Sequence, residues 1–328
     1  MGVYSREILY GLARSRPESR FLYCYRPHRL LKSFADSHPW NARRRLLSYS
    51  TPPRADLFHA LNQRFEYPSK AIPSVVTFHD LFVLSGGYST PTFRHRFAAQ
   101  ARQAAERADL IIAVSQFTAG QVRDLLQVPE SRLRVVPHGT RSLAAPAANE
   151  AREDIILHVG AIQKRKNLVR LVEAFESLEP AWRLILAGAP GGFESQQTLD
   201  CINASPAKAR IEVTGYVSDA ALETLYRRAR IFAFPSLDEG FGMPVIEAMA
   251  RGVPVLTSNR SALPEAAGGA ALLVDALEVD AIAQGLKELT QDPALRADLR
   301  AKGLARAASM TWERAVEQTW AVYQELLR

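Results

Sequence analysis

The sequence contains only two cysteines, Cys24 and Cys201, and they lie far apart in segments of apolar pattern. Two cysteines are too few for a disulfide scaffold and are typical of a reducing cytoplasm. The chain also has no run of about 18 uninterrupted apolar residues, which excludes a membrane-spanning helix. The first twenty residues carry charge throughout and lack the apolar run of a signal peptide. From these absences we expect a soluble intracellular protein.

Charge is divided unevenly between the two halves of the chain. Residues 1–150 hold 21 Lys and Arg against 11 Asp and Glu, whereas the remaining residues hold 20 against 23. An excess of ten positive charges favours an anionic partner for the first half, such as nucleic acid, a membrane surface or a phosphorylated substrate. The Arg-rich composition of a GC-rich genome would explain the excess equally well. Nucleic acid is disfavoured because no aromatic RNA motif or recognition-helix signature is present.

The order of apolar segments predicts an α/β fold. A length of 328 residues suits two domains of about 150 residues each. Strands are predicted at 21–25, 57–61, 74–78, 110–114 and 133–136, and again at 155–159, 184–187, 211–214, 231–234, 253–257 and 271–274. Helical patterns between them indicate parallel sheets covered by helices, with ligands at the carboxyl ends of the strands. The Pro- and Ala-rich stretch 142–151 is the best linker candidate.

The stretch 235–252, PSLDEGFGMPVIEAMARG, carries the strongest signal for a binding site. A strand ends, a loop with two glycines follows, and Pro244 stands in the first turn of a helix. Such a loop aims backbone N–H groups and the positive helix end at a ligand, which suits a diphosphate. Glu239 and Glu247 lie on the loop and in the helix, where two carboxylates can grip the hydroxyls of a sugar and a ribose. A plain turn with a helix-capping acid would explain either feature alone, but the combination favours a site.

A second signal lies at 160–167, GAIQKRKN, directly after a predicted strand. Arg165 and Lys166 precede a helix, again at the carboxyl end of a strand. Two fixed cations there could neutralise a leaving diphosphate, which stabilises charge where it develops. A run of basic residues alone usually marks a solvated surface. Here its position at the carboxyl end of a strand favours a binding site.

These motifs resemble those of the retaining GT-B glycosyltransferases of family 4, and the resemblance covers almost the whole chain. EGFGMPVIE resembles the E-x7-E signature, and GAIQKRKNLVRLVEAF resembles the donor-phosphate loop and helix. GYVSDAALETLYRRARIFAFPS is similar to the nucleotide-base region, and VTFHDL, AVSQFT and VVPHGT look like three strand ends of the first domain. The resemblance implies two Rossmann-like doubly wound domains facing a central cleft. Their expected order is an acceptor-side domain at 1–141, a linker at 142–152, a nucleotide-sugar domain at 153–310 and a helix at 311–328 that crosses back to the first domain.

The resemblance also implies roles for single residues. The implied catalytic residues are His79 and Glu239, and the implied donor-binding residues are Arg165, Lys166, Val217, Gly240, Phe241, Gly242, Met243 and Glu247. Arg165 and Lys166 would bind the diphosphate, and Glu247 the ribose hydroxyls. The backbone near Val217 would read the base, and His79 would face the donor sugar, unless it is a hydrogen-bonded structural histidine. No Asp-x-Asp is present, so the metal clamp of another glycosyltransferase fold is not expected. The resemblance implies no cofactor, and the nucleotide sugar would be a substrate.

Three departures from the family pattern qualify this expectation. The chain starts inside the loop that precedes the segment matching GVYSREILYGLA, so either the start is misassigned or the first domain lacks its first strand. Ala161 stands where relatives have Arg or Thr, which would leave Arg165 and Lys166 to grip the phosphate alone. His138 replaces the more usual Asn of the last motif in the first domain.

The expected activity is that of a hexosyltransferase. By resemblance, it would move mannose from GDP-mannose, or a sugar from a UDP-sugar, to a glycan or lipid-linked glycan acceptor. Residues 27–47 mix Arg and Lys with Leu, Phe and Trp, so they could contact the inner face of the membrane peripherally; a basic surface loop is the alternative. A non-catalytic or inactive nucleotide-sugar-binding protein is the alternative function, because of the truncated start. A UDP-sugar 2-epimerase is disfavoured because such enzymes lack the E-x7-E loop.

Overall fold

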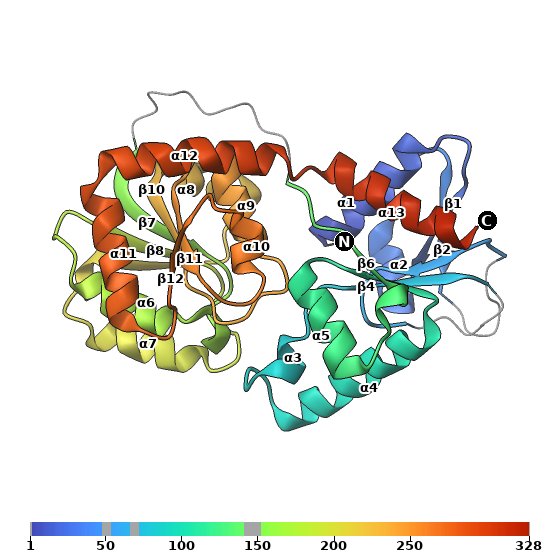
Figure 1. Cartoon of the computed structure of the whole chain (residues 1–328), viewed down its shortest axis with the longest axis horizontal. Helices are drawn as coiled ribbons and strands as arrows, with labels where there is room; N and C mark the ends of the chain where they lie inside the picture. The colour runs from blue at the N-terminus through green and yellow to red at the C-terminus, as the bar shows by residue number, and fades with distance from the viewer. Residues whose placement is uncertain (1, 48–53, 66–71, 141–151, 328) are drawn as a thin grey trace. The chain divides into compact units, whose positions relative to one another are not determined.

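The chain divides into two compact units (Figure 1). The computed structural model describes residues 2–47, 54–65, 72–140 and 152–327. The N-terminal unit comprises Met1–Leu84, Pro91–Gly139 and Thr311–Arg328, and the C-terminal unit comprises Ser85–Thr90 and Thr140–Met310. The predicted linker at 142–152 lies outside the described residues, except for Arg152.

The C-terminal unit is built on one six-stranded parallel sheet. Its strands are β7 (Glu153–Val159), β8 (Arg183–Ala187), β9 (Ile211–Gly215), β10 (Ala229–Phe234), β11 (Val255–Ser258) and β12 (Leu272–Val274). They lie in the order β12-β11-β10-β7-β8-β9, and every pairing is parallel. This is the strand order of a doubly wound dinucleotide-binding sheet, the class of sheet that the family resemblance implies. The order reverses between β7 and β10, which lie side by side.

Helices cover both faces of this sheet. They are η2 (Lys164–Lys166), α6 (Leu168–Glu176), α7 (Ser195–Ala204), η3 (Lys208–Arg210), α8 (Asp219–Arg228), α9 (Met243–Ala250), α10 (Leu263–Ala267), α11 (Val279–Gln291) and α12 (Pro293–Ala308). The predicted apolar stripe of α6, which includes Leu171 and Phe175, is buried in the core. In α9, Pro244 occupies the first turn, as the sequence predicts.

The N-terminal unit contains two parallel sheets. The strands are β1 (Phe21–Tyr25), β2 (Ala42–Leu46), β3 (Phe58–Ala60), β4 (Ser74–Phe78), β5 (Leu110–Ala113) and β6 (Leu133–Val135). β1 pairs with β2, and the other four lie in the order β3-β4-β5-β6. Strand β2 was not predicted, because three of its five residues are arginines and hide the strand pattern. Among the described residues, no strand pair joins the two sheets.

Helices of the N-terminal unit come from both ends of the chain. They are α1 (Val3–Ser15), α2 (Pro27–Ser33), α3 (Phe82–Ser85), α4 (Pro91–Arg107), α5 (Gln116–Leu126), η1 (Glu130–Arg132) and α13 (Trp312–Leu326). Ser115 caps α5 by accepting a hydrogen bond from the Thr118 N–H at 3.0 Å, and the Thr311 side chain caps α13 in the same way. In the part of the chain that the structure describes, none of the helices has the length and hydropathy to cross a membrane.

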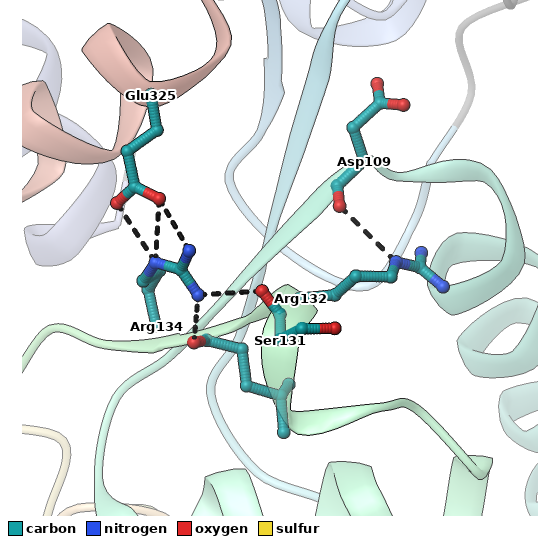
Figure 2. Close-up of polar contacts among 6 residues, drawn as sticks. Asp109, Ser131, Arg132, Arg134 and Glu325 are labelled. Carbon is teal, nitrogen blue, oxygen red and sulfur yellow. Dashed lines mark hydrogen bonds and ion pairs between the residues drawn. The ribbon is translucent and has the colours of Figure 1, made fainter.

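The C-terminal helix α13 packs against α1 and lies near β6. The approach to α1 is close, since a Cβ on Gly11 would lie 2.4 Å from Val316 Cγ2. Figure 2 shows the contact with β6, where the Arg134 guanidinium pairs with the Glu325 carboxylate at 2.5 Å and also donates to the Ser131 carbonyl at 2.9 Å. These contacts place the last helix in the N-terminal unit.

Candidate functional site

The strongest candidate site lies where the C-terminal sheet reverses its strand order. β7 and β10 are neighbours at the middle of the sheet, and the two motifs singled out in the sequence follow their carboxyl ends. Helices on opposite faces diverge from such a point and leave room for a ligand. The loops 160–167 and 235–243 therefore form what we call the switch-point site.

The two loops are tied together by hydrogen bonds. The Asn167 side chain donates to the Pro235 carbonyl at 3.1 Å, and it is buried. The Leu237 N–H donates to the Arg165 carbonyl at 2.8 Å, and the Arg165 guanidinium donates to the Asp238 carbonyl at 2.7 Å. Each bond joins one loop to the other, so the side chains that they carry are held in a fixed arrangement.

Three charged side chains meet in this site. Glu239 Oε1 lies 2.7 Å from Arg165 Nη1 and 2.5 Å from Lys166 Nζ. All three are largely buried, with side-chain exposures of 10%, 12% and 7% respectively. We call them the switch-point triad. The sequence argument placed each residue near a donor but did not predict that the carboxylate pairs with both cations.

The Glu239 carboxylate compensates one of the two positive charges in the triad. Burial alone would raise the pKa of Glu239, but Lys166 and Arg165 outweigh burial and lower it to about 2. Glu239 therefore stays ionised at every pH near neutrality. One carboxylate faces two cations, so the triad retains a positive charge. An anionic ligand would complete the balance.

Lys166 contacts an aromatic ring as well as the carboxylate. Its ammonium lies 4.4 Å from the centre of the Phe234 ring, a cation–π contact. Behind it, buried His158 meets the Ala233 carbonyl through Nδ1 at 3.0 Å. Burial, aided by the Lys166 charge, lowers the pKa of His158 to about 3, so this imidazole is neutral. Gly160 has φ +149°, and a Cβ there would lie 3.3 Å from Lys166 Cε, so the glycine makes room for the lysine.

The glycine-rich loop leads directly into α9. Gly242 precedes the helix with φ +99°, a conformation that favours glycine. The Glu239 N–H donates to Ser261 Oγ at 3.1 Å, and Phe241 is buried, so the loop is anchored on both sides of Gly240. An anchored loop at a helix N-terminus has the geometry of an anion site.

Glu247 lies in α9, one helical turn beyond Met243. Its carboxylate accepts a hydrogen bond from the Tyr226 hydroxyl of α8 at 3.2 Å. Val217 follows β9 in a separate loop, where its neighbour Tyr216 is 86% exposed and Ser218 caps α8. The structure thus brings the triad and residues 240–243 together in two joined loops, with Glu247 in the helix that follows and Val217 in a different loop.

His79 is the one predicted site residue in the N-terminal unit. It follows β4 and is largely buried, and burial lowers its pKa. Its Nε2 donates to the Leu61 carbonyl at 2.9 Å, and its Nδ1 lies 3.3 Å from Nε2 of His138. Because a carbonyl only accepts, His79 carries its proton on Nε2, and His138 Nε2–H is the donor to Nδ1. Both ring nitrogens of His79 are therefore engaged.

No candidate metal centre accompanies these residues in the described ranges. There, no group of three or more His, Cys, Asp or Glu side chains is arranged to hold a metal ion. The charged chemistry of the site rests on the triad and on the backbone of the loop before α9.

Solved structures place this architecture in a known fold class. The UDP complex of Alr3699/HepE from Anabaena aligns with a TM-score of 0.75 over 99% of this chain and 97% of that chain, at 17% identity. A sucrose-phosphate synthase from Thermosynechococcus elongatus aligns with a TM-score of 0.70 over 83% of this chain and 73% of that one, at 25% identity. The fold is that of the GT-B glycosyltransferases.

Sequence comparison narrows the class to a family. Residues 9–141 match the family model described as Glycosyltransferase Family 4, and residues 142–306 match the one described as Glycosyl transferases group 1. The O-antigen chain mannosyltransferase B of Escherichia coli is 32% identical over 286 residues, which cover 82% of this chain and 74% of that protein. The serotype-specific mannosyltransferase WbdA of Escherichia coli is 26% identical over 77% of this chain and 34% of its own length. The chain belongs to glycosyltransferase family 4, group 1, and is a hexosyltransferase.

Two residues that the sequence argument did not place in the site interact with its members. The Tyr226 hydroxyl of α8 donates to Glu247, and the charge of Lys166 lowers the pKa of His158, which lies in the strand predicted at 155–159. Both residues are fully buried. Their polar atoms were missed because periodicity reports which face a residue occupies and not what its terminal atoms meet.

Proposed function

We propose that this hexosyltransferase transfers mannose from GDP-mannose to a glycan or lipid-linked glycan, with retention of configuration and without a metal ion. The relatives named above as mannosyltransferases support mannose as the sugar. Alr3699/HepE was solved with UDP and glucose, so a UDP-sugar is the second candidate donor. The sequence relatives and a structural neighbour are named as enzymes, which does not favour the alternative of a non-catalytic nucleotide-sugar-binding protein.

The switch-point triad carries this proposal. Arg165 and Lys166 are fixed, largely desolvated cations that already hold one carboxylate. A nucleoside diphosphate brings more negative charge than Glu239 alone, and the positive end of the α9 dipole lies at the same loop. The diphosphate would therefore bind to Arg165 and Lys166. Glu239 would hold these two cations in place between turnovers.

The other contacts with the donor would come from residues around the triad and from the N-terminal unit. Glu247 would accept hydrogen bonds from the ribose hydroxyls, and the backbone near Val217 would meet the base. Glu239 and residues 240–243 would hold the sugar and its phosphate. His79 would contact the sugar from the N-terminal unit, and since both its nitrogens are engaged, that contact requires it to release the Leu61 carbonyl or His138.

Transfer with retention can proceed on one face of the sugar, with the leaving diphosphate as the base. The bond between the anomeric carbon and the diphosphate oxygen would break while the acceptor oxygen bonds to the same face of the sugar. The acceptor proton would pass to the leaving phosphate oxygen, and Arg165 and Lys166 would stabilise the charge that develops on the diphosphate. No protein nucleophile is needed in this route.

We further propose that the N-terminal unit meets an anionic membrane surface through residues 27–47. Leu31 is 81% exposed, Phe34 65% and Trp40 82%, and arginines such as Arg43 and Arg45 lie exposed among them. Apolar and basic groups on one segment suit an interface with anionic lipid. This placement would bring the enzyme to a lipid-linked acceptor at the inner face of the membrane.

A vesicle assay tests the membrane proposal. We expect more co-sedimentation with vesicles containing phosphatidylglycerol than with phosphatidylcholine alone, and a loss of binding in Leu31→Ser with Trp40→Ser. Leu277→Ser, a change at a 42% exposed leucine of the C-terminal unit, is the matched control. Equal binding to neutral and anionic vesicles would refute the proposal.

A thermal-shift panel tests the proposed donor. GDP, UDP and ADP and their common sugars are compared with and without EDTA, because a ligand of the folded state raises the midpoint. We expect the largest shift with GDP and GDP-mannose, unchanged by EDTA, and product NMR should show the same anomeric configuration as the donor. A selective shift with UDP would indicate a UDP-sugar as the donor in place of GDP-mannose. A shift that EDTA abolishes would overturn the proposal that no metal ion is needed.

A further inference from the structure

A buried tyrosine lies behind the carboxylate proposed to hold the ribose. Tyr226 belongs to α8 and is 0% exposed, whereas Glu247 belongs to α9 and is half-buried. The tyrosine hydroxyl reaches across to Glu247 Oε2 at 3.2 Å. The hydrogen bond therefore joins a group that solvent cannot reach to one that a ligand can.

The tyrosine ring is held on its faces by neighbours. The Arg251 guanidinium lies 4.7 Å from the ring centre and also donates to the Glu247 backbone carbonyl at 2.9 Å. Arg251 is fixed in turn by an ion pair with Glu223 at 2.8 Å, and the Phe232 ring lies 5.8 Å from Tyr226. With its ring fixed, the hydroxyl has one position, and a buried hydroxyl needs a partner there.

The direction of this hydrogen bond is fixed. Burial, and after it the charge of Glu247, raises the pKa of Tyr226 well above its ordinary value, so the phenol stays protonated and donates. A carboxylate only accepts, and the tyrosine occupies a lone pair of Oε2. The hydrogen bond therefore restrains the orientation of the carboxylate, and with it the direction of its lone pairs.

We infer that Tyr226 is a positioning residue that orients Glu247 toward the two ribose hydroxyls and so sets the preference of the site for ribonucleotides. The inference rests on the proposed function, because it takes Glu247 to be the ribose ligand. Tyr226 does not touch the nucleotide. Its effect reaches the ligand only through the carboxylate, so it acts on ribose recognition and leaves the diphosphate and base contacts unchanged.

Nucleotide binding by calorimetry tests the inference. Dissociation constants are measured for GDP and 2′,3′-dideoxy-GDP, with UDP and its dideoxy analogue in parallel. Hydrogen bonds to a charged group predict a ribose preference of about tenfold or more in the unmodified enzyme. We expect Tyr226→Phe to lose most of that preference while its affinity for the dideoxy nucleotide stays unchanged. Tyr23→Phe, which removes another buried hydroxyl with a carbonyl partner at 2.6 Å, should retain the full preference.

A second variant separates positioning from packing. Glu247→Gln should also reduce the ribose preference, and Tyr226→Phe with Glu247→Gln should lose no more than Glu247→Gln alone. Additive losses would overturn the inference, as would a Tyr226→Phe variant that weakens both nucleotides equally and keeps their ratio. If the unmodified enzyme itself shows no ribose preference, the proposed role of Glu247 fails as well, and the two failures are thus distinguished.

Discussion

The two units differ in the charged groups that they bury. The C-terminal unit buries the switch-point triad in charged form, because the Glu239 carboxylate pairs with both cations. In the N-terminal unit, burial lowers the pKa of His59, His79 and His138, so that these imidazoles are neutral, as is His158 in the C-terminal unit. The two units thus share neutral histidines and differ in the buried charged triad.

With the triad as the proposed diphosphate site, the net charge of a region is a poor guide to where an anion binds. The ten excess positive charges lie in residues 1–150, whereas the buried cation pair lies in the half with three excess negative charges. Exposed arginines are hydrated and screened, so they attract anions weakly and without position. Arg165 and Lys166 are few, but they are desolvated and fixed, which is what recognition of a diphosphate requires.

The largest expected effect comes from breaking the triad. Glu239→Gln leaves two buried cations without their carboxylate, and we expect it to lower the free energy of unfolding of the C-terminal unit by about 3–5 kcal/mol. Hydrogen exchange followed peptide by peptide in urea separates the two units. The N-terminal unit should be unaffected.

The control for this variant is Glu212→Gln. Glu212 pairs with Arg183 at 3.0 Å, but both side chains are about half exposed, so the loss should stay below about 1 kcal/mol. Equal destabilisation by the two variants would show that the triad is an ordinary surface pair.

Acid should destabilise both units over the same pH range, through His59 in the N-terminal unit and His158 in the C-terminal unit. The pKa of His59 is lowered to about 3, so between pH 6.5 and 3 the unfolded chain binds a proton that the folded unit refuses. Stability from this neutral histidine is complete above pH 6.5 and is lost as pH falls, by a few kcal/mol. Glu239, with a pKa of about 2, loses its contribution only below about pH 4.5.

Hydrogen exchange at pH 7.0, 5.5 and 4.5 measures this loss in each unit. His59→Gln should make the N-terminal unit less sensitive to acid, and His28→Gln, at an exposed histidine of α2, should not. Unchanged protection between pH 7.0 and pH 4.5, or equal effects of the two substitutions, would contradict this prediction.

Close packing of α13 on α1 predicts opposite effects at two helical glycines. A Cβ at Gly11 would press on Val316, so Gly11→Ala should cost the N-terminal unit about 1–3 kcal/mol. A Cβ at Gly120 has no neighbour closer than 3.9 Å, so Gly120→Ala should stabilise the same unit by about 0.5–1 kcal/mol. Thermal unfolding of both variants checks the signs, and two changes of the same sign would refute the packing argument.

The smallest effect is expected at the ion pair between β6 and α13. Arg134 and Glu325 are 33% and 39% exposed, so their coupling should not exceed about 1 kcal/mol and should weaken in salt. A double-mutant cycle with Arg134→Gln and Glu325→Gln measures it. Coupling above about 2 kcal/mol, unchanged in 1 M salt, would mean that this pair holds α13 in place.

Much of the C-terminal unit could be predicted from sequence, because its strands are apolar runs and its helices have clear stripes. Leu171 and Phe175 fall on the buried face that their spacing predicts, and Pro244 marks the start of α9. The strands of the N-terminal unit were harder to predict from sequence. Strand β2 contains Arg43, Arg44 and Arg45, and its parallel pairing with β1 depends on partners 21 residues earlier, such as Phe21 for Ala42.

The site was predictable as a set of motifs but not as a set of contacts. The strand ends and the glycine loop identified Arg165, Lys166 and Glu239, since ligands gather at the carboxyl edge of parallel strands. That Glu239 bridges both cations depends on β7 and β10 being neighbours, which sequence spacing does not state. The buried hydroxyl of Tyr226 was hidden for the same reason.

The most direct test of the donor site compares a nucleoside diphosphate with its nucleoside. Calorimetry gives the affinities for GDP and guanosine, with UDP and uridine in parallel, in the unmodified enzyme, Lys166→Met and Lys164→Met. Lys164 is the matched control, because it lies in the same basic run but is 43% exposed and pairs with Glu194. We predict that Lys166→Met removes a tenfold to hundredfold share of the diphosphate preference and that Lys164→Met removes none. An undiminished preference in Lys166→Met would contradict the assignment of the switch-point triad to the donor diphosphate.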